Sequence, residues 1–171
     1  MIEEASNRLA ILLKRNGSDV SYEVLTYALA NILNIVMVTI VSITIGFISG
    51  KPLDTIISLI AFGVIRHFSG GLHAKTMDQC FIVSTMIIVV PPHIMLSTNA
   101  VLGISIFGLI CYILFAPNVT EYLSSTKDQK LRNKFISVLL VSVNLYIQST
   151  TLAIVFLVQA LLIIPYSRKG V

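Results

Sequence analysis

The chain begins with an amphipathic pattern over residues 2–15. Apolar residues recur there every three or four positions, which places them on one face of a helix, with most of the charged residues on the other faces. Gly17 marks the end of this helix. Such a helix either lies on a membrane surface or packs against another part of the protein, and we favour the membrane surface for residues 1–17. The apolar face consists of Ile2, Ala5, Leu9, Leu12 and Leu13.

Apolar runs separated by polar or proline-containing breaks follow this segment. Because a helix needs ~20 residues to cross a bilayer and several runs are shorter, an arrangement of about four spans with additional half-helices competes with one of about six. We expect an all-α fold, namely a polytopic membrane protein with about six transmembrane helices, some of them short. The runs cover residues 24–48, 55–65, 80–90, 101–115, 135–147 and 152–164.

The composition excludes a soluble enzyme. Hydrophobic residues make up 56% of the 171 residues and charged residues only 12%, and the mean hydropathy is +0.90. Soluble domains have about 25% charged residues, and a chain this apolar is not disordered. Residues 1–171 are therefore expected to form a single integral membrane domain in the lipid bilayer. The net charge of +4 does not indicate nucleic-acid binding, because the basic residues are scattered along the chain.

The basic residues predict which side of the membrane each connection faces. If the N-terminus is inside and the chain crosses at each apolar run, every Lys and Arg except Lys51 falls on the cytoplasmic side. This asymmetry follows the positive-inside rule. We therefore expect both termini in the cytoplasm, together with a cytoplasmic loop over residues 118–134.

Residues 66–80 form the most unusual segment of the chain. They include two of the three histidines, one of the two cysteines, a pair of glycines and several charged residues, yet they lie between two apolar runs. Ionisable groups at membrane depth are costly and therefore mark candidate functional sites. We treat residues 66–80 as the candidate catalytic segment.

Cys80 and His73 are suited to nucleophilic acyl transfer. An imidazole that takes the thiol proton leaves a thiolate, which is the reactive form of cysteine. An unbroken helix would separate the two residues by about 10.5 Å along its axis, so a direct pair requires a bend, and Gly70 and Gly71 supply flexibility just before His73. Cys80 would then open the next helix, whose N-terminus stabilises a thiolate. Asp78 would orient the imidazole or cap that helix.

The same residues also have simpler explanations. A cysteine at the start of a span more often packs than reacts, and interfacial histidines are commonly structural. A zinc site of His67, His73 and Cys80 lacks any recognised ligand spacing, so we expect no metal. Cys111 lies in the middle of an apolar run and is expected to be a packing residue.

At these positions the sequence resembles the accessory gene regulator B (AgrB) family of bacterial membrane cysteine endopeptidases, which process quorum-sensing propeptides. The resemblance rests on Arg66, the run Phe-Ser-Gly-Gly-Leu-His-Ala-Lys over residues 68–75, and Cys80. The chain length, the polytopic layout and the amphipathic start also agree with the family. The resemblance places the family's catalytic pair on His73 and Cys80, and its motif Arg and second Gly on Arg66 and Gly71.

The resemblance implies a reaction on a propeptide similar to AgrD at the inner membrane face. Cys80 would attack a backbone carbonyl, with His73 as base and then as acid to the leaving amine, so that the C-terminal tail departs and a thioester remains. A substrate Cys or Ser would then close a thiolactone or lactone ring, and exclusion of water would favour this step. Arg66 would bind an acidic group of the propeptide or steady the oxyanion. The resemblance implies no cofactor.

Two functions of other classes remain open from the residues alone, a small transporter or channel and a non-catalytic assembly subunit. Polar residues within the spans would suit a transporter, although helix–helix hydrogen bonds explain them as well. Short spans with polar faces would be stabilised by pairing, which favours a homodimer. The polar residues in question are Asn31, Asn34, Asn144 and Gln159.

Overall fold

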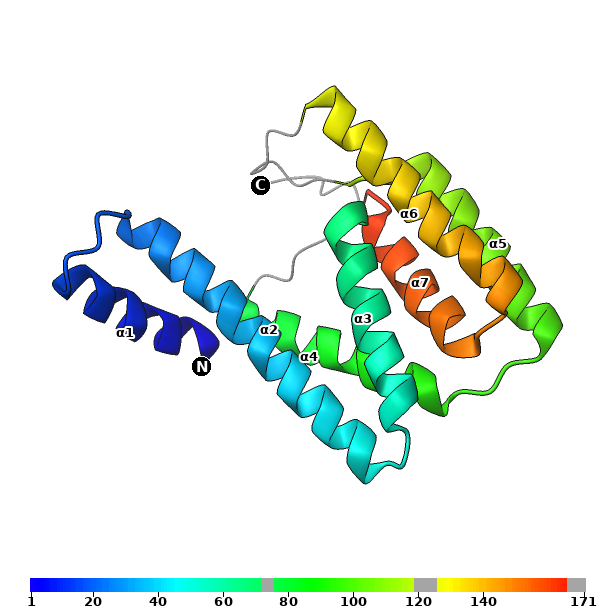
Figure 1. The fold of residues 1–171 in the computed structure, drawn as a ribbon, viewed down its shortest axis with the longest axis horizontal. Coiled ribbons are helices and arrows are strands. Elements are labelled where there is room, and N and C mark those ends of the chain that lie inside the picture. Colours follow the sequence, from blue (N-terminus) through cyan, green and yellow to red (C-terminus); the bar gives the residue numbers. More distant parts are fainter. Residues whose placement is uncertain (72–75, 119–125, 166–171) are drawn as a thin grey trace.

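The computed structural model describes residues 1–71, 76–118 and 126–165. These residues form α-helices and one short 3-10 helix, and no strand is present among them, which confirms the all-α expectation (Figure 1). The elements are α1 (Ile2–Arg15), α2 (Tyr22–Ile48), α3 (Pro52–Ser69), α4 (Met77–Val89), η1 (Pro91–His93), α5 (Thr98–Phe115), α6 (Lys127–Ile147) and α7 (Thr150–Ile163).

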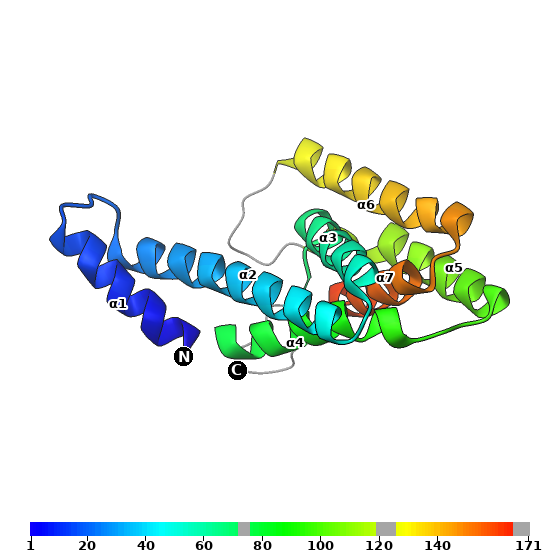
Figure 2. The ribbon, with the colours of Figure 1, turned by 60° about the horizontal axis from the view of Figure 1, so that its bottom comes forward.

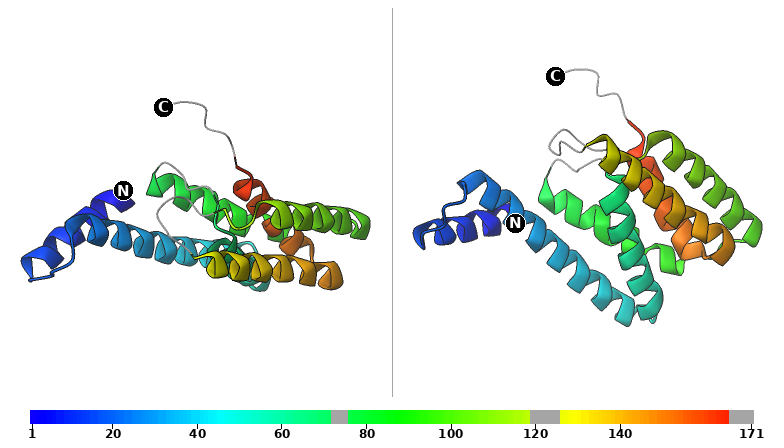
Figure 3. Two further views of the ribbon diagram at one scale, coloured as in Figure 1. Left: turned by 90° about the horizontal axis from the view of Figure 1, so that it is seen from above. Right: turned by 45° about the horizontal axis from the view of Figure 1, so that its top comes forward.

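Helix α3 lies between two groups of helices. It packs against α2 and α4 on one side and against α6 and α7 on the other, while α5 contacts both α6 and α7. The two groups lie side by side along the long axis of the molecule (Figures 2 and 3). Helix α1 lies at the end of the molecule, beside α2 and close to the start of α4 (Figure 1). The C-terminal end of α3, with Gly70, therefore lies where the two groups meet.

The helices have the length and surface of a membrane protein. Within the described residues, α2, α3 and α5 are long and apolar enough to cross a bilayer, and α7 is a shorter apolar helix. Large apolar side chains are exposed along α2, α3 and α5. A soluble protein rarely exposes so much contiguous apolar surface. The number of crossings and their direction stay predictions.

The core lies where α3, α4, α5, α6 and α7 meet. Its largest members are fully buried, and the hydroxyl of Tyr112 donates a 3.2 Å hydrogen bond to the backbone oxygen of Phe156, which joins α5 to α7. The fully buried apolar residues of this core include Ile65, Ile88, Tyr112, Val141, Val155 and Ile163.

Small residues let α2 approach α3 closely. A side chain at Gly46 would come within 2.8 Å of Thr55, so only glycine fits there. The buried residues of α2 recur every four positions and are mostly small, which keeps one face of this long helix against the protein. That face consists of Ala30, Asn34, Val38, Ser42 and Gly46.

Helix ends differ from the sequence-based boundaries in two places. Helix α3 extends well beyond the apolar run at 55–65, because Pro52 opens the helix and the polar turn around Arg66 continues it. Residues 127–134, which we expected in a loop, belong to α6. Thr126 and Gln129 form a reciprocal capping box that starts this helix in polar sequence, before the apolar run begins.

Helix α1 packs on the protein through a narrow face that differs from its leucine-rich stripe. Ile2, Ser6 and Ala10 are buried, with Ile2 near the start of α4. The leucines of the predicted apolar face are instead exposed. Contact with the protein and contact with a membrane surface are therefore compatible for α1, because Leu9, Leu12 and Leu13 stay exposed while Ile2, Ser6 and Ala10 pack on the protein.

Candidate functional site

A cavity of about 330 Å³ lies between α2, α3 and α4. Apolar side chains such as Val38, Phe62 and Ile88 form part of its wall. Several polar groups project into the same space, and they come from all three helices. Those that enter the argument below are Asn31, Asn34, Arg66, His67, Cys80 and Ser84. An apolar cavity with a few convergent polar groups is the usual form of a binding or catalytic site.

Cys80 lies in the first turn of α4. This helix begins after Thr76, whose side chain accepts a hydrogen bond from the backbone N–H of Gln79. Around the sulfur, the side-chain Nδ2 of Asn34 donates over 3.7 Å, and the Ser84 hydroxyl lies 3.9 Å away. The positive end of the helix dipole and these polar groups surround a half-buried thiol. The expectation that Cys80 lies at a helix start is confirmed.

Arg66 and His67 occupy the last turn of α3 and line the same cavity. The Arg66 guanidinium lies over the ring of Phe62, 5.7 Å from its centroid, and lines the same cavity as Cys80. The His67 ring contacts the Phe68 ring edge-on at 5.0 Å.

The glycine pair forms a constrained turn after α3. Gly70 has φ 67° and Gly71 has φ 131°, which are backbone angles that other residues rarely adopt. The Gln159 amide of α7 donates to the Gly70 oxygen over 2.6 Å and to the Ser69 hydroxyl over 3.0 Å. The turn also exchanges backbone hydrogen bonds with Asn118: the Gly71 N–H donates to the Asn118 oxygen, and the Asn118 N–H donates to the Ser69 oxygen.

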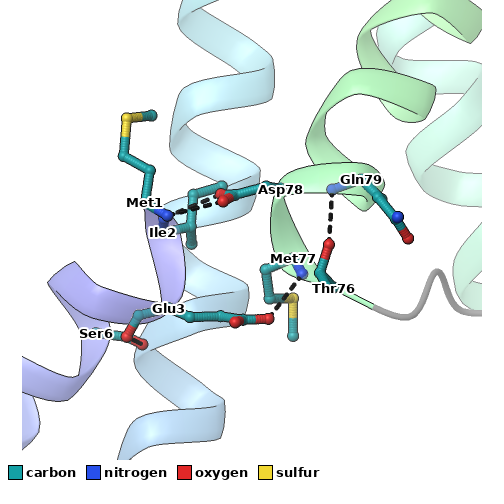
Figure 4. Close-up of polar contacts among 8 residues, drawn as sticks. All are labelled: Met1, Ile2, Glu3, Ser6, Thr76, Met77, Asp78 and Gln79. Carbon is teal, nitrogen blue, oxygen red and sulfur yellow. Dashed lines mark hydrogen bonds and ion pairs between the residues drawn. The ribbon is translucent and has the colours of Figure 1, made fainter.

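Asp78 connects α4 to the start of α1 (Figure 4). Its carboxylate accepts hydrogen bonds from the Met1 amine at 2.7 Å and the Ile2 N–H at 3.0 Å, while Glu3 accepts from the Met77 N–H at 3.1 Å. The hydrogen bond from the Met1 amine, and then that from Ile2, holds the pKa of Asp78 below its ordinary value. The cap of α4 is Thr76, so the expectation that Asp78 would cap this helix is wrong.

His73 lies outside the described residues, so the direct His73–Cys80 pair and the three-residue zinc reading stay untested. The described residues nevertheless test one requirement of the direct pair, namely a break in the helix before Cys80. Thr76 has an extended backbone, with φ −129° and ψ 154°, and α4 begins only at Met77. Residues 73–80 therefore do not form one continuous helix, as a direct pair requires.

The structure brings together part of the predicted set. Arg66, Gly70 and Cys80 line one cavity, and Gly71 is buried immediately beside it. Asp78 faces α1 instead. Sequence reasoning had not placed Asn34 in the site, although its position three residues after Asn31 gave a usable signal that both amides face protein.

Other polar residues that had suggested a transporter join helices to one another. The Asn144 amide donates to the Ser105 hydroxyl over 3.1 Å, which links α6 to α5, and Gln159 links α7 to the turn after α3. These contacts account for two buried amides as helix–helix hydrogen bonds. Asn144 and Gln159 therefore give no specific support to a transporter function.

Comparison with known proteins gives a consistent result. The family model described as "Accessory gene regulator B" matches residues 6–166. Relatives named accessory gene regulator protein B include one from Staphylococcus aureus (strain bovine RF122 / ET3-1), 27% identical over 105 residues, and one from Staphylococcus carnosus (strain TM300), 27% identical over 143 residues. No solved structure matches the chain.

The coverage of these relatives differs. The Staphylococcus aureus match covers 59% of this chain and 56% of the relative, so the chain spans little more than half the length of that protein. The Staphylococcus carnosus match covers 80% of this chain and 74% of the relative. A third relative, from Staphylococcus saprophyticus, is 28% identical over 115 residues and is covered to 61%.

Proposed function

Because the chain belongs to the accessory gene regulator B family, we propose that it is a membrane cysteine endopeptidase of a quorum-sensing system. Its substrate would be a propeptide similar to AgrD, which it cleaves at the inner face of the bacterial cell membrane. The catalytic residues are Cys80 as nucleophile and His73 as general base. This proposal requires no metal or organic cofactor.

The reaction begins when His73 accepts the proton of the Cys80 thiol. The resulting sulfur attacks a backbone carbonyl carbon of the propeptide, so that an S–C bond forms and the carbonyl electron pair moves to oxygen. When this intermediate collapses, the C–N bond breaks and His73 returns its proton to the leaving amine. The C-terminal tail departs and a thioester to Cys80 remains. A Cys or Ser of the substrate then attacks the thioester carbonyl and closes a thiolactone or lactone ring, while the bond to Cys80 breaks and the proton of the attacking group returns to the Cys80 thiol.

The observation that carries the proposal is the position of Cys80. It lies in the first turn of α4, at a cavity that Arg66 also lines, and both residues belong to the segment whose sequence resembles the family motif. The helix N-terminus and the guanidinium both favour the charged form of a thiol. Cys111, the other cysteine, is buried in the core among apolar side chains and lacks these features. The two cysteines therefore carry the same thiol group but lie in different environments, one at a cavity with polar groups and the other in the apolar core.

Co-expression with a candidate propeptide tests the proposal. The candidate is a short peptide with an amphipathic start, a central Cys or Ser and an acidic tail. We expect mass spectrometry to show cleavage with the wild-type protein and loss of cleavage in Cys80→Ala, because no thiol remains to attack the carbonyl. His73→Gln should also lose cleavage, since an amide does not accept the thiol proton.

Cys111→Ala is the matched control and should retain cleavage. All variants are first compared for accumulation in the membrane fraction, so that loss of activity is separated from loss of protein. Cleavage by Cys80→Ala at the wild-type rate would show that the mechanism is wrong. A homodimer stays a prediction, and chemical cross-linking in the same membranes would test it.

A further inference from the structure

Asn34 of α2 reaches the sulfur of Cys80 across the cavity. Its side-chain Nδ2 lies 3.7 Å from the Cys80 Sγ, a contact between residues 46 positions apart in the chain. The Asn34 side chain is only 9% exposed, although it belongs to a long apolar helix. A buried polar side chain costs free energy unless its groups are hydrogen-bonded, so an amide at this position of the cavity wall needs an explanation.

The hydrogen bonds of Asn34 do not explain it as a structural residue. Its Oδ1 atom is buried and has no hydrogen-bond partner among the described residues. Asn31, one turn earlier, instead donates to the backbone oxygen of Tyr27 in its own helix, and the buried Asn144 bonds to Ser105 and Ser149. Asn34 alone of these three amides donates to a candidate nucleophile.

We propose that Asn34 is a further catalytic residue, whose side-chain N–H donates to the Cys80 sulfur and stabilises the thiolate. This inference rests on the proposed function, in which that thiolate is the nucleophile. A hydrogen bond to the charged form of a group favours that form. Hydrogen bonds with one ionised partner are stronger than neutral ones, and the partly buried site strengthens them further.

Asn34 also fixes where the sulfur points. Cys80 comes from α4 and Asn34 from α2, so the contact holds the nucleophile against the wall that faces Arg66 of α3. The hydroxyl of Ser84, one turn after Cys80 in α4, lies 3.9 Å from the same sulfur. The thiol is thus positioned from two helices before a substrate arrives, which reduces the reorganisation needed for attack.

Other charged and titratable groups lie on the helices around Cys80, some of them in the cavity and some at the start of α4. Arg66 and His67 face the cavity from α3, Asp78 lies in the first turn of α4, and Glu3 of α1 bonds to the start of that helix. Helix α2 contributes Asn31 and Asn34 to the cavity. A test must therefore remove the Asn34 amide and leave these groups in place.

Alkylation of Cys80 by iodoacetamide tests the inference without any propeptide. In a Cys111→Ala background Cys80 is the single thiol of the sequence, and the rate is measured across a pH series in the full-length membrane protein. We expect Asn34→Leu to shift the pH–rate curve to higher pH and to slow alkylation at neutral pH by about tenfold, the scale of a lost hydrogen bond to a charged group. Leucine has nearly the same volume and no donor.

The plateau at high pH separates electrostatics from access, because Cys80 is then fully ionised in every variant. The inference predicts that the plateau of Asn34→Leu does not fall below that of the wild-type protein, because a thiolate of higher pKa is at least as strong a nucleophile. Ser42→Ala, which removes a polar group from the same buried face of α2 about two turns beyond Asn34 and outside the cavity, should leave the whole curve in place. Asn34→Asp should shift the curve further than Asn34→Leu, because a carboxylate has no donor and repels the thiolate. If Asn34→Leu does not accumulate in the membrane, the pH–rate curve of Asn34→Asp tests the inference instead.

A wild-type curve in Asn34→Leu, or a fall in its plateau equal to its fall at neutral pH, would overturn the inference. Its failure is distinguishable from failure of the proposed function. A shifted alkylation curve in a protein that cleaves no propeptide would support the contact and reject the peptidase. Normal propeptide cleavage with an unshifted curve would support the peptidase and reject the role of Asn34.

Discussion

Gly71 has neither the backbone angles nor the space to carry a side chain. Its φ of 131° is in the region that favours glycine. A Cβ at this position would also lie 3.1 Å from the Gln159 amide nitrogen and 3.3 Å from the Leu162 backbone oxygen. Both partners are held, since Gln159 is hydrogen-bonded to Gly70 and Leu162 belongs to the buried α7. The turn after α3 therefore depends on glycine at this position.

Gly71→Ala should consequently abolish or strongly reduce propeptide cleavage while the protein still accumulates in the membrane. The backbone strain is on the order of 1–3 kcal/mol, which displaces this turn more readily than it unfolds the helices. Gly103→Ala is the matched control, because a Cβ there meets nothing within 4 Å. Cleavage assays on membranes with equal amounts of each protein make the comparison. Equal activity in the two variants would contradict this account of the turn.

Residue types allowed part of the site to be predicted from the sequence. Arg66 and Cys80 could be singled out because charged and nucleophilic groups are rare between apolar runs. Gln159 could not be assigned to the glycine turn, since the two are 89 positions apart and only the packing of α3 on α7 brings them together. Asn34 could be recognised as facing protein, whereas its contact with Cys80 depends on the crossing of α2 and α4.

At the scale of elements, α1 contributes hydrogen bonds to the start of α4, only two residues before Cys80. The carboxylate of Asp78 and the N–H of Met77 both bond to the first turn of α1. The amphipathic pattern predicted the helix, but it did not predict this docking, because the buried face of α1 is not its leucine stripe. The docking depends on where two helix ends meet, which the local sequence does not specify.

The docking should weaken in acid. Because the Met1 amine and then Ile2 hold the pKa of Asp78 below its ordinary value of 3.8, the ionised carboxylate stabilises the docked state above that pH. This contribution is lost as the pH falls through the lowered pKa. Spin labels at positions 5 and 79, in a background of Cys80→Ser and Cys111→Ala, should report a short distance at neutral pH and a broader one in strong acid.

Asp78→Asn should give the broader distance already at neutral pH, since an amide forms no ion pair with the Met1 amine. Asp54→Asn removes a carboxylate from the first turn of α3, at the other end of that helix from the cavity, and should behave as the unmodified protein does. A short distance retained by Asp78→Asn at every pH would show that α1 is held by the packing of Ile2, Ser6 and Ala10 alone.

At the scale of the whole molecule, the C-terminal ends of three helices meet. Asn118, after α5, exchanges hydrogen bonds with Ser69 and Gly71 after α3, and its side chain donates to the Ile163 oxygen of α7 over 2.9 Å. Helices α3, α5 and α7 therefore end on one side. The chain must return between them, through α4 with η1 and through α6. This alternation agrees with a six-span order even though α4 and α7 are short.

Labelling of single cysteines in intact cells tests this topology. Probes near residues 15, 74, 128 and 169 should report the cytoplasm, and probes near residues 51 and 97 should report the outside. The placement of charge gives the reason. The basic first turns of α6 come after Asn118, which bonds to Gly71 at the C-terminal end of α3. Lys51 lies at the opposite end of α3. An outside signal at residue 128 would place the basic start of α6 on the wrong side and would leave Cys80 without access to a cytoplasmic propeptide. That result would contradict both the six-span order and the proposed substrate, because both require the start of α4 to face the cytoplasm.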